Sequence, residues 1–416
     1  MAGAAPPIHD VAHLALRLGR LMLLNGADTA HVQDAVLGFT RRFGFQAHLL
    51  VHAEGLLLTV EDADGFRTKI GRQVAGFAVN MDALVAIERI RAGGAGLAEI
   101  ERQLDAVEHA PRRYPAWLVV VGVGVTAAAL ARLFGGSWIV VAVSLLVGMV
   151  TQGLRLALAQ RGVNPIAGAG LAAFGGGATG ALTMLAFPDE SPTLCLVAAG
   201  MILVPGVPLI NGVRDTIGNH IGNGIARLLF GTVTVLAIAF GLFLAAAIAG
   251  DALPVGAHFP PLPLAQDLLF SALAGAGYAL LFNVPPRLAW ACCLCALAGH
   301  GARTALVGLG LDLPLASLAG AFLATLLARL VGQHAQAPAV TFAFPGVVAM
   351  IPGFYAFQAG IGGLAIMQAG AASPATLLGE TAGLAVTAML VTLGIGIGLS
   401  LALAAPLPSP APRGAP

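Results

Sequence analysis

Long apolar stretches, separated by short polar or proline-containing breaks, make up most of the chain from about residue 116 onward. A helix of about 20 residues crosses the ~30 Å hydrocarbon core of a bilayer, so these stretches predict about ten transmembrane helices. They fall into two groups of five, at residues 116–134, 138–159, 166–187, 194–213 and 224–249, and at residues 264–283, 288–307, 313–330, 339–361 and 377–404.

The first 111 residues follow a different pattern. Apolar residues recur there at helical spacing, with Asp28 or Thr29 available to cap the second helix, and two stretches rich in β-formers flank a turn of Asp and Gly residues. This pattern predicts a small α+β domain. Its predicted helices are residues 10–24, 28–43, 80–92 and 96–109, and its two or three short strands lie within residues 45–60 and 66–70.

Residues 203–215, with the sequence LVPGVPLINGVRD, interrupt the fourth apolar stretch. The two prolines remove backbone donors and the two glycines loosen the chain, and in lipid the freed carbonyl groups need other partners. Broken helices of this kind carry the binding sites of many secondary transporters, and an ionisable residue at such depth indicates a functional site. The alternative is a proline kink followed by an ordinary loop.

Short segments recur at offsets of 147 and 148 residues. Several matches in one register indicate a duplicated membrane unit, although Leu, Phe and Gly matches are common in such a composition. The matching segments are LVPG at 203–206 with MIPG at 350–353, LF at 133–134 with LF at 281–282, and QGLR at 152–155 with HGAR at 300–303.

Composition agrees with a membrane protein. Of the 416 residues 58% are hydrophobic and 10% are charged, whereas soluble proteins have about 25% charged residues. Of the 41 Lys, Arg, Asp and Glu residues (21 plus 20), 23 lie within residues 1–111, which indicates a water-facing domain. A net charge of +1 gives no reason to expect a nucleic-acid partner. The first residues lack the features of a cleaved signal peptide.

Candidate chemical groups are few. The four cysteines lie in apolar runs at spacings that fit neither a zinc site nor a redox motif, so we interpret them as buried apolar residues. The histidines of the first domain form no recognisable metal or hydrolase motif, and we expect neither a metal nor a cofactor, with a catalytic site there as the weaker alternative. Only seven acids follow residue 111: Asp189, Glu190, Asp215, Asp251, Asp267, Asp312 and Glu380.

The arginines predict the orientation. If the first domain is cytoplasmic, nine of the arginines after residue 111 lie on the cytoplasmic side and only Arg132 and Arg303 lie toward the outside. Positive residues favour the cytoplasmic side, so both termini are expected there. Five spans per group is an odd number, and the two groups must therefore cross the membrane in opposite senses, as in inverted-repeat transporters.

Three motifs together resemble the threonine/serine exporter family: LMLLNGADTAHVQDAV at residues 21–36, PGVPLINGVRD at 205–215 and IPGFYAF at 351–357. The resemblance covers nearly the whole chain and implies a cytoplasmic domain followed by two five-span modules, which are separate proteins in some relatives. It implies proton-driven export of small hydroxy amino acids across a bacterial inner membrane. Related split systems are linked to dicarboxylate export. The family's N-terminal domain has been thought hydrolase-like, but no motif of this sequence maps onto such a role.

We therefore predict a polytopic α-helical membrane protein, with two inverted five-helix repeats and a small α+β cytoplasmic domain. The expected function is secondary active export of threonine or serine by alternating access, with protons and the lipid bilayer as partners. A dicarboxylate exporter and, more weakly, a membrane-bound hydrolase are the alternatives, and homo-oligomerisation stays open. The predicted boundaries are 1–111 for the cytoplasmic domain, 112–250 for the first module, 251–263 for a linker, 264–405 for the second module and 406–416 for a disordered tail.

The expected site combines the helix breaks with nearby polar groups. A zwitterion needs donors for its carboxylate, an acceptor for its ammonium group and a polar partner for its hydroxyl. Glu380 is the candidate for proton coupling because no basic residue lies near it in sequence. The alternatives are that Arg214 and Asp215 form a simple loop ion pair and that Glu380 caps the last helix. The predicted substrate-binding residues are Pro205, Gly206, Asn211, Arg214, Asp215, Pro352, Gly353 and Gln358.

Overall fold

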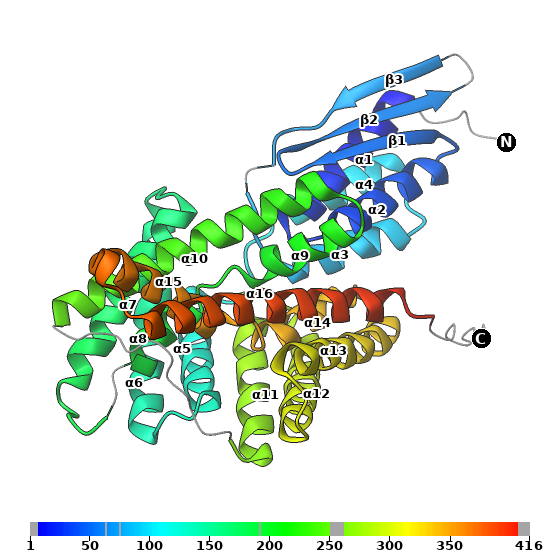
Figure 1. Ribbon diagram of the computed structural model, residues 1–416. Helices are drawn as coiled ribbons and strands as arrows, with labels where there is room; N and C mark the ends of the chain where they lie inside the picture. Colours follow the sequence, from blue (N-terminus) through cyan, green and yellow to red (C-terminus); the bar gives the residue numbers. More distant parts are fainter. Residues whose placement is uncertain (1–6, 63–64, 75, 191–192, 250–261, 407–416) are drawn as a thin grey trace.

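The computed structural model describes residues 7–62, 65–74, 76–190, 193–249 and 262–406 (Figure 1). Its N-terminal part contains four helices and an antiparallel sheet with the strand order β1-β2-β3, which confirms the predicted pattern closely. The elements are α1 (Ile8–Leu24), α2 (Thr29–Arg42), β1 (Gln46–His52), β2 (Gly55–Asp62), β3 (Gly65–Ile70), α3 (Met81–Ala92) and α4 (Leu97–His109).

The helices of this part cover one face of the sheet (Figure 1). On β2 the alternate residues Leu56, Leu58 and Val60 are buried, as expected for a strand with one face on a core. Helix α1 meets that face closely at Gly19, where a Cβ atom would lie 2.9 Å from Leu56 Cδ1 of β2. The N-terminal part therefore has its own apolar core.

Twelve further helices follow in the described part of the chain. Eight helices are long and apolar enough to cross a membrane, or up to ten if each of two bent pairs counts as one span. The first six are α5 (Ala116–Leu133), α6 (Trp138–Gln160), α7 (Pro165–Met184), α8 (Thr193–Met201), α9 (Gly206–Ile217) and α10 (Ile221–Ala249). The others are α11 (Leu264–Leu281), α12 (Ala289–Gly308), α13 (Leu313–Ala335), α14 (Val340–Val348), α15 (Gly353–Ala369) and α16 (Ala375–Ala404), with short 3-10 turns η1 (Pro286–Leu288) and η2 (Gly370–Ala372).

The two bent pairs are broken at the Pro-Gly dipeptides that the sequence singles out. Helices α8 and α9 meet at 59°, and α14 and α15 meet at 50°. Pro205 and Pro352 are the residues before the first turns of α9 and α15, which begin at Gly206 and Gly353. Since proline donates no backbone hydrogen bond, it is tolerated at such a helix start and ends the preceding helical pattern.

The same packing pattern occurs twice. In each group of six, the first helix packs on the second, the third packs on the sixth, and the fifth packs on the sixth. The two groups also exchange contacts, because α10 packs on α15 while α16 packs on α9, and the equivalent helices α5 and α11 pack on each other. The groups therefore form one interlocked body, as a duplicated unit would.

Equivalent helices turn opposite ends toward the N-terminal part. Helix α5 begins just after α4, whereas α11 reaches the same region with its C-terminal end. There Met81 N donates a hydrogen bond to Phe282 O at 2.9 Å, and Tyr114 Oη donates to Val284 O at 2.7 Å. Asn283, the residue after the C-cap of α11, has a left-handed φ of 56°. Relative to the N-terminal part, α5 and α11 run in opposite directions.

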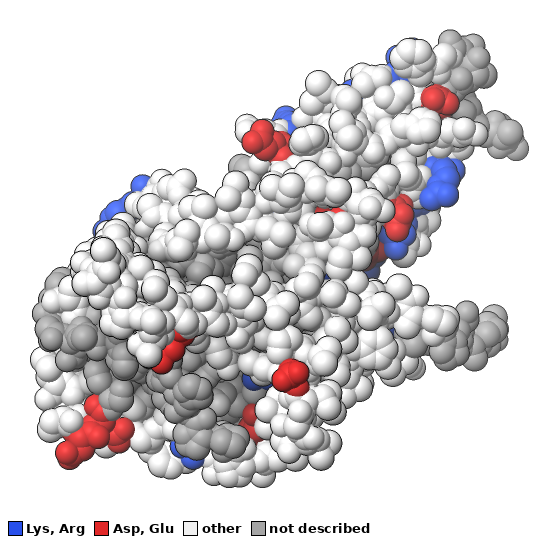
Figure 2. All heavy atoms as spheres, in the orientation of Figure 1, with Lys and Arg blue, Asp and Glu red and all other residues white. Residues whose placement is uncertain are grey.

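Charged side chains gather over the N-terminal part and at the margins of the helical body, and the surface of the body between them is largely uncharged (Figure 2). Large apolar side chains are exposed there, such as Leu236 and Phe240 of α10 and Met389 of α16. Such a surface is suited to contact with lipid. The predicted linker at 251–263 and tail at 406–416 lie almost entirely outside the described residues.

Candidate functional site

The loop between α1 and α2 is bound to α9 by buried hydrogen bonds. Asn211 Nδ2 donates to Gly26 O at 3.0 Å, and Thr29 N donates to Asp215 Oδ1 at 2.9 Å. Gly26 has a φ of +102°, a conformation that favours glycine and that turns this backbone toward α9. The segments 21–36 and 205–215, which are far apart in sequence, therefore meet in the fold.

Two buried ion pairs reinforce this contact. Arg214 Nη1 lies 3.0 Å from Asp28 Oδ1, and Arg227 Nε of α10 lies 3.0 Å from Asp215 Oδ2. Arg227 Nη2 also donates to Ala27 O at 2.9 Å. Arg214 and Asp215, neighbours in sequence, thus have separate partners, and the expectation that they form a simple loop ion pair is wrong.

The pKa of Asp28 reflects its surroundings. Burial by itself raises that pKa. The facing guanidinium of Arg214, the imidazole of His31 and the more distant Arg227 together lower it by more than burial raises it, so the pKa of Asp28 lies below its ordinary value. Asp28 is therefore ionised near neutral pH. Removing either partner would leave a buried charge without compensation.

Aromatic and amide side chains complete the contact. Phe77 of the N-terminal part packs on Phe230 of α10, with ring centroids 5.3 Å apart, and the guanidinium of Arg227 lies 5.2 Å from the Phe77 ring centroid. Asn223 Nδ2 donates to Thr29 Oγ1 at 3.1 Å and to Val51 O at 2.9 Å. The N-terminal part is thus bound to the helical body by hydrogen bonds, charge and apolar packing together.

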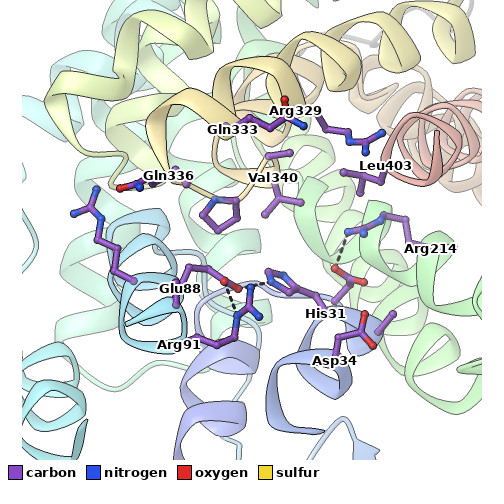
Figure 3. Close-up of a pocket in the computed structure, with 18 of the residues that line it drawn as sticks. His31, Asp34, Glu88, Arg91, Arg214, Arg329, Gln333, Gln336, Val340 and Leu403 are labelled. Atoms are coloured by element: carbon purple, nitrogen blue, oxygen red, sulfur yellow. Dashed lines mark hydrogen bonds and ion pairs between the residues drawn. The ribbon is translucent and has the colours of Figure 1, made fainter. Parts of the chain in front are cut away.

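A cavity of about 970 Å³ lies beside this contact, between the N-terminal part and the ends of α9, α13, α14 and α16 (Figure 3). Such a volume is in the upper range of small-molecule sites. Both signs of charge line it: Asp28, His31, Asp34, Glu88, Arg91, Arg214 and Arg329. Val340, the first residue of α14, lies at the wall opposite His31, so the cavity leads to the start of the second bent pair.

His31, Glu88 and Arg91 form a connected group in this wall (Figure 3). His31 Nε2 lies 2.5 Å from Glu88 Oε1, and Arg91 Nε donates to Glu88 Oε2 at 2.8 Å. Burial lowers the pKa of His31, but the Glu88 carboxylate raises it more, and the net pKa is above its ordinary value. Burial likewise raises the pKa of Glu88, while its bond to His31 and the charge of Arg91 bring it below the usual range. Within the described residues, no group of three or more His, Cys, Asp and Glu side chains is placed to hold a metal ion.

The two helix breaks contact each other in the middle of the helical body. A Cβ atom at Gly353 would lie 2.8 Å from Val204 Cγ2, and one at Gly206 would overlap the Ile351 side chain. The residual cavity between the breaks has a volume of about 10 Å³ and apolar walls that include Met201. This space holds at most one water molecule. The centre is therefore closed in this conformation.

Gln358 and Glu380, the other predicted site residues, have contrasting environments. Gln358 of α15 is fully buried little more than one turn beyond Gly353, and neither end of its amide has a hydrogen-bond partner among the described residues. A buried amide without partners is unfavourable by about 1–3 kcal/mol and calls for another reason. Glu380 is exposed on the second turn of α16, which Pro374 precedes as the N-cap. The expectation that Glu380 caps this helix is wrong.

Sequence reasoning missed a buried cluster in the second group of helices. Asp267 of α11 is bonded to His300 of α12, which in turn contacts Arg303. Two signals were available: Asp267 is one of seven acids after residue 111, and His300 and Arg303 belong to a repeated segment. The spacing between Asp267 and His300 did not reveal that their helices pack together.

Comparisons with known proteins divide the chain into two modules. A family model described as "Putative threonine/serine exporter" matches residues 13–249, and one described as "Threonine/Serine exporter, ThrE" matches residues 267–406. The "Probable succinate transporter subunit YjjP" of Escherichia coli strain K12 is 28% identical over 249 residues, which cover 58% of this chain and 95% of that protein. The "Probable threonine/serine exporter" of Mycobacterium tuberculosis strain H37Rv is 23% identical over 384 residues, covering 86% of this chain and 71% of that protein. No solved structure matches.

Proposed function

The chain belongs to the threonine/serine exporter family, with the two modules of the family fused in one chain, and from this premise we propose that it exports threonine or serine across the bacterial inner membrane by proton-driven alternating access. Membership in an exporter family favours a transporter over an enzyme. We place the N-terminal part in the cytoplasm, in agreement with the distribution of arginines.

The opposite directions of α5 and α11 support an inverted repeat. Both helices have an end at the N-terminal part, but it is the start of α5 and the end of α11. The two bent pairs also run in opposite directions relative to the N-terminal part. The α8–α9 pair has its end near that part, at the end of α9, whereas the α14–α15 pair has its start there, at the start of α14. In inverted-repeat transporters the substrate site lies between the repeats, and rocking of one against the other opens it to either side.

The observation that carries the proposal is the contact of the two half-helix starts at the centre. Helices α9 and α15 both begin there, at Gly206 and Gly353, and first-turn N–H groups with the positive end of a helix dipole favour a carboxylate. The unpartnered amide of Gln358 lies just beyond. When the breaks separate, these groups suit the carboxylate and hydroxyl of threonine.

We assign the N-terminal part a gating role. Its loop occupies Asn211 and Asp215, so these two side chains can meet the ammonium group of an entering substrate, before it reaches the centre, only after the loop moves away. The charged cavity beside the loop then serves as the cytoplasmic entrance to α14. Arg214, which pairs with Asp28 in the closed contact, is freed by the same movement.

Dicarboxylate export is the second candidate. A relative named as a succinate transporter subunit covers the N-terminal part and the first group of helices. In addition, Arg91, Arg214 and Arg329 line the entrance cavity and could meet a second carboxylate. A substrate with two carboxylates would use both helix starts at the centre.

Counterflow into proteoliposomes tests the proposal. Vesicles containing the purified chain are preloaded with unlabelled threonine, serine or succinate, and uptake of the labelled compound is followed. We expect saturable uptake of threonine and serine that is stimulated by the preloaded substrate. Uptake of succinate alone would transfer the assignment to a dicarboxylate, and no stimulated uptake of any of the three would contradict the proposal.

A further inference from the structure

A buried polar cluster joins α11, α12 and the break between α14 and α15. His300 Nδ1 lies 2.9 Å from Asp267 Oδ1, and Thr304 Oγ1 donates to Asp267 Oδ2 at 2.8 Å. On its other side, His300 Nε2 lies 2.7 Å from Arg303 Nη2. Arg303 Nη1 donates to Met350 O at 3.3 Å. Arg303 therefore connects the histidine to the turn that separates α14 from α15.

The bonding pattern fixes the protonation of the histidine ring. Arginine has only donors and stays charged, so His300 Nε2 must accept the hydrogen bond from Arg303. The proton of the neutral ring then lies on Nδ1 and is donated to the Asp267 carboxylate. Asp267 and His300 are 3% and 2% exposed, so little water competes with these bonds.

A second proton on His300 is incompatible with this arrangement. It would occupy Nε2, and two donors would then face each other between His300 and Arg303. The imidazolium and guanidinium also repel each other, more strongly where water is scarce. Protonated His300 thus keeps its bond to Asp267 but loses the bond to Arg303, which must turn away.

We propose that His300 is the proton-binding residue of transport and that Arg303 holds the α14–α15 break closed while His300 is neutral, an inference that rests on the proposed export function. Proton binding at Nε2 displaces Arg303, and the Met350 carbonyl loses its donor. Release of that proton restores both bonds. His300 acts on the substrate site through Arg303 and is a coupling residue rather than a substrate ligand.

The surroundings restrict the titration to this cluster. Among the described residues, the charged or titratable groups that act on His300 and Arg303 are Asp267 of α11 and Tyr355 of α15, apart from each other. Arg132 of α5, whose partner Gln266 precedes Asp267, is bonded to that amide, with Nη2 and Oε1 2.6 Å apart. A proton entering the cluster therefore has His300 and Asp267 as its acceptors.

The cluster is also placed to receive protons from the side opposite the N-terminal part. Asp267 is in the first turn of α11, whose other end contacts the N-terminal part. Arg303 and Thr304 are partly exposed, which gives a short path to the surface. For an exporter driven by inward proton flow, loading from that side is the required direction.

Only one module carries this device. At the equivalent positions, 148 residues earlier, Val119 replaces Asp267 and Gln152 replaces His300, while Arg155 is present. Neither replacement can bind a proton near neutral pH. Proton coupling is therefore assigned to the second break, and the first break follows it mechanically.

Two readouts on the full chain in proteoliposomes test this inference. In the first, Ile351→Cys reports opening of the break by its rate of thiol labelling between about pH 4 and 8, a range that extends below that of an ordinary histidine because burial and the facing guanidinium disfavour the second proton. We expect labelling to rise as pH falls, and to be low and independent of pH after His300→Gln is added. A flat profile in the chain that retains His300 would overturn the proposal, whether or not any substrate is transported.

The second readout separates coupling from transport. We expect His300→Gln to lose export driven by a pH gradient while retaining counterflow, and Glu380→Gln to retain both. The assignment of His300 would be overturned if His300→Gln still exported substrate in response to a pH gradient. It would also be overturned if only Glu380→Gln lost that gradient-driven export. Absence of counterflow in the unmodified chain would instead contradict the proposed function, and the labelling profile would still decide the role of His300.

Discussion

Arg214 forms its ion pair with Asp28 of the α1–α2 loop and not with Asp215, the residue next to it. The side chains of Arg214 and Asp28 are only 10% and 6% exposed, so little water reaches this contact between the N-terminal part and α9. Arg214 Nη1 also donates to Asn211 Oδ1 at 3.0 Å. This connection supports the proposed gating role of the N-terminal part.

Removing one member of this pair should release the loop. Breaking a buried ion pair from one side is unfavourable by about 3–5 kcal/mol, so Asp28→Ala and Arg214→Gln should both expose residues 25–29 to proteolysis in the purified chain. The double charge reversal Asp28→Arg with Arg214→Asp should restore part of the protection.

The matched control for this experiment is Arg102→Gln on α4. Its partner Glu99 is one turn away, and both side chains are at least one-third exposed, so this surface pair contributes at most about 1 kcal/mol. Cleavage of Asp28→Ala at the rate of the unmodified chain would show that the pair does not hold the gate.

Periodicity and proline chemistry predict the elements of this fold well, because they act locally. The helix breaks at Pro205 and Pro352 follow from the absence of a proline donor, and the burial of alternate residues on β2 follows from strand geometry. Partners across the fold are not predictable in this way. The sequence does not indicate that Asp215, a predicted substrate residue, binds Thr29 and Arg227 in this conformation. The contact of Asp267 with His300 likewise depends on how α11 packs on α12.

The contact between α2 and α3 should weaken as pH rises. Because the pKa of His31 is above its ordinary value of 6.5 in the folded protein, its stabilising contribution is complete below that pH and is lost as pH rises through the folded pKa. The pKa of Glu88 is lowered, so its stabilising contribution changes in the opposite direction. That contribution is complete above the ordinary Glu pKa of 4.5 and is lost only as pH falls below that value.

Thermal unfolding midpoints between about pH 6 and 9 measure this effect, in the range where histidine with an acidic partner titrates. We expect the midpoint of the unmodified chain to fall as pH rises through this range. The midpoint of His31→Gln should fall less. His48→Gln is the control, since the side chain of His48 is 79% exposed. An identical pH profile for the unmodified chain and His31→Gln would contradict the prediction.

The contact between the two breaks should not tolerate a side chain at Gly353. A Cβ atom there would lie 2.8 Å from Val204 Cγ2, and valine cannot rotate away freely because it is branched at Cβ. Gly353→Ala should therefore destabilise the protein by about 1–3 kcal/mol and slow counterflow. Adding Val204→Ala should relieve both effects.

Gly363→Ala provides the comparison within the same helix. Its added Cβ atom would meet nothing within 4 Å, so the change should be neutral or stabilise α15 by up to about 1 kcal/mol. Equal losses of thermal stability and transport in Gly353→Ala and Gly363→Ala would show that the contact between the breaks is not responsible.

Gln358 should be needed for transport although its buried amide destabilises the closed conformation. Its amide is buried with no hydrogen-bond partner in the described part of the chain, so Gln358→Leu should raise the thermal unfolding midpoint, corresponding to about 1–3 kcal/mol. The same change should abolish counterflow, because the amide finds its partner only in the bound substrate.

Thr325→Val of α13 is the matched control. Among the described residues, Thr325 is also fully buried with an unpartnered hydroxyl, and its replacement should stabilise the protein without affecting counterflow. Normal counterflow by Gln358→Leu would remove Gln358 from the site and leave the helix starts as its polar groups.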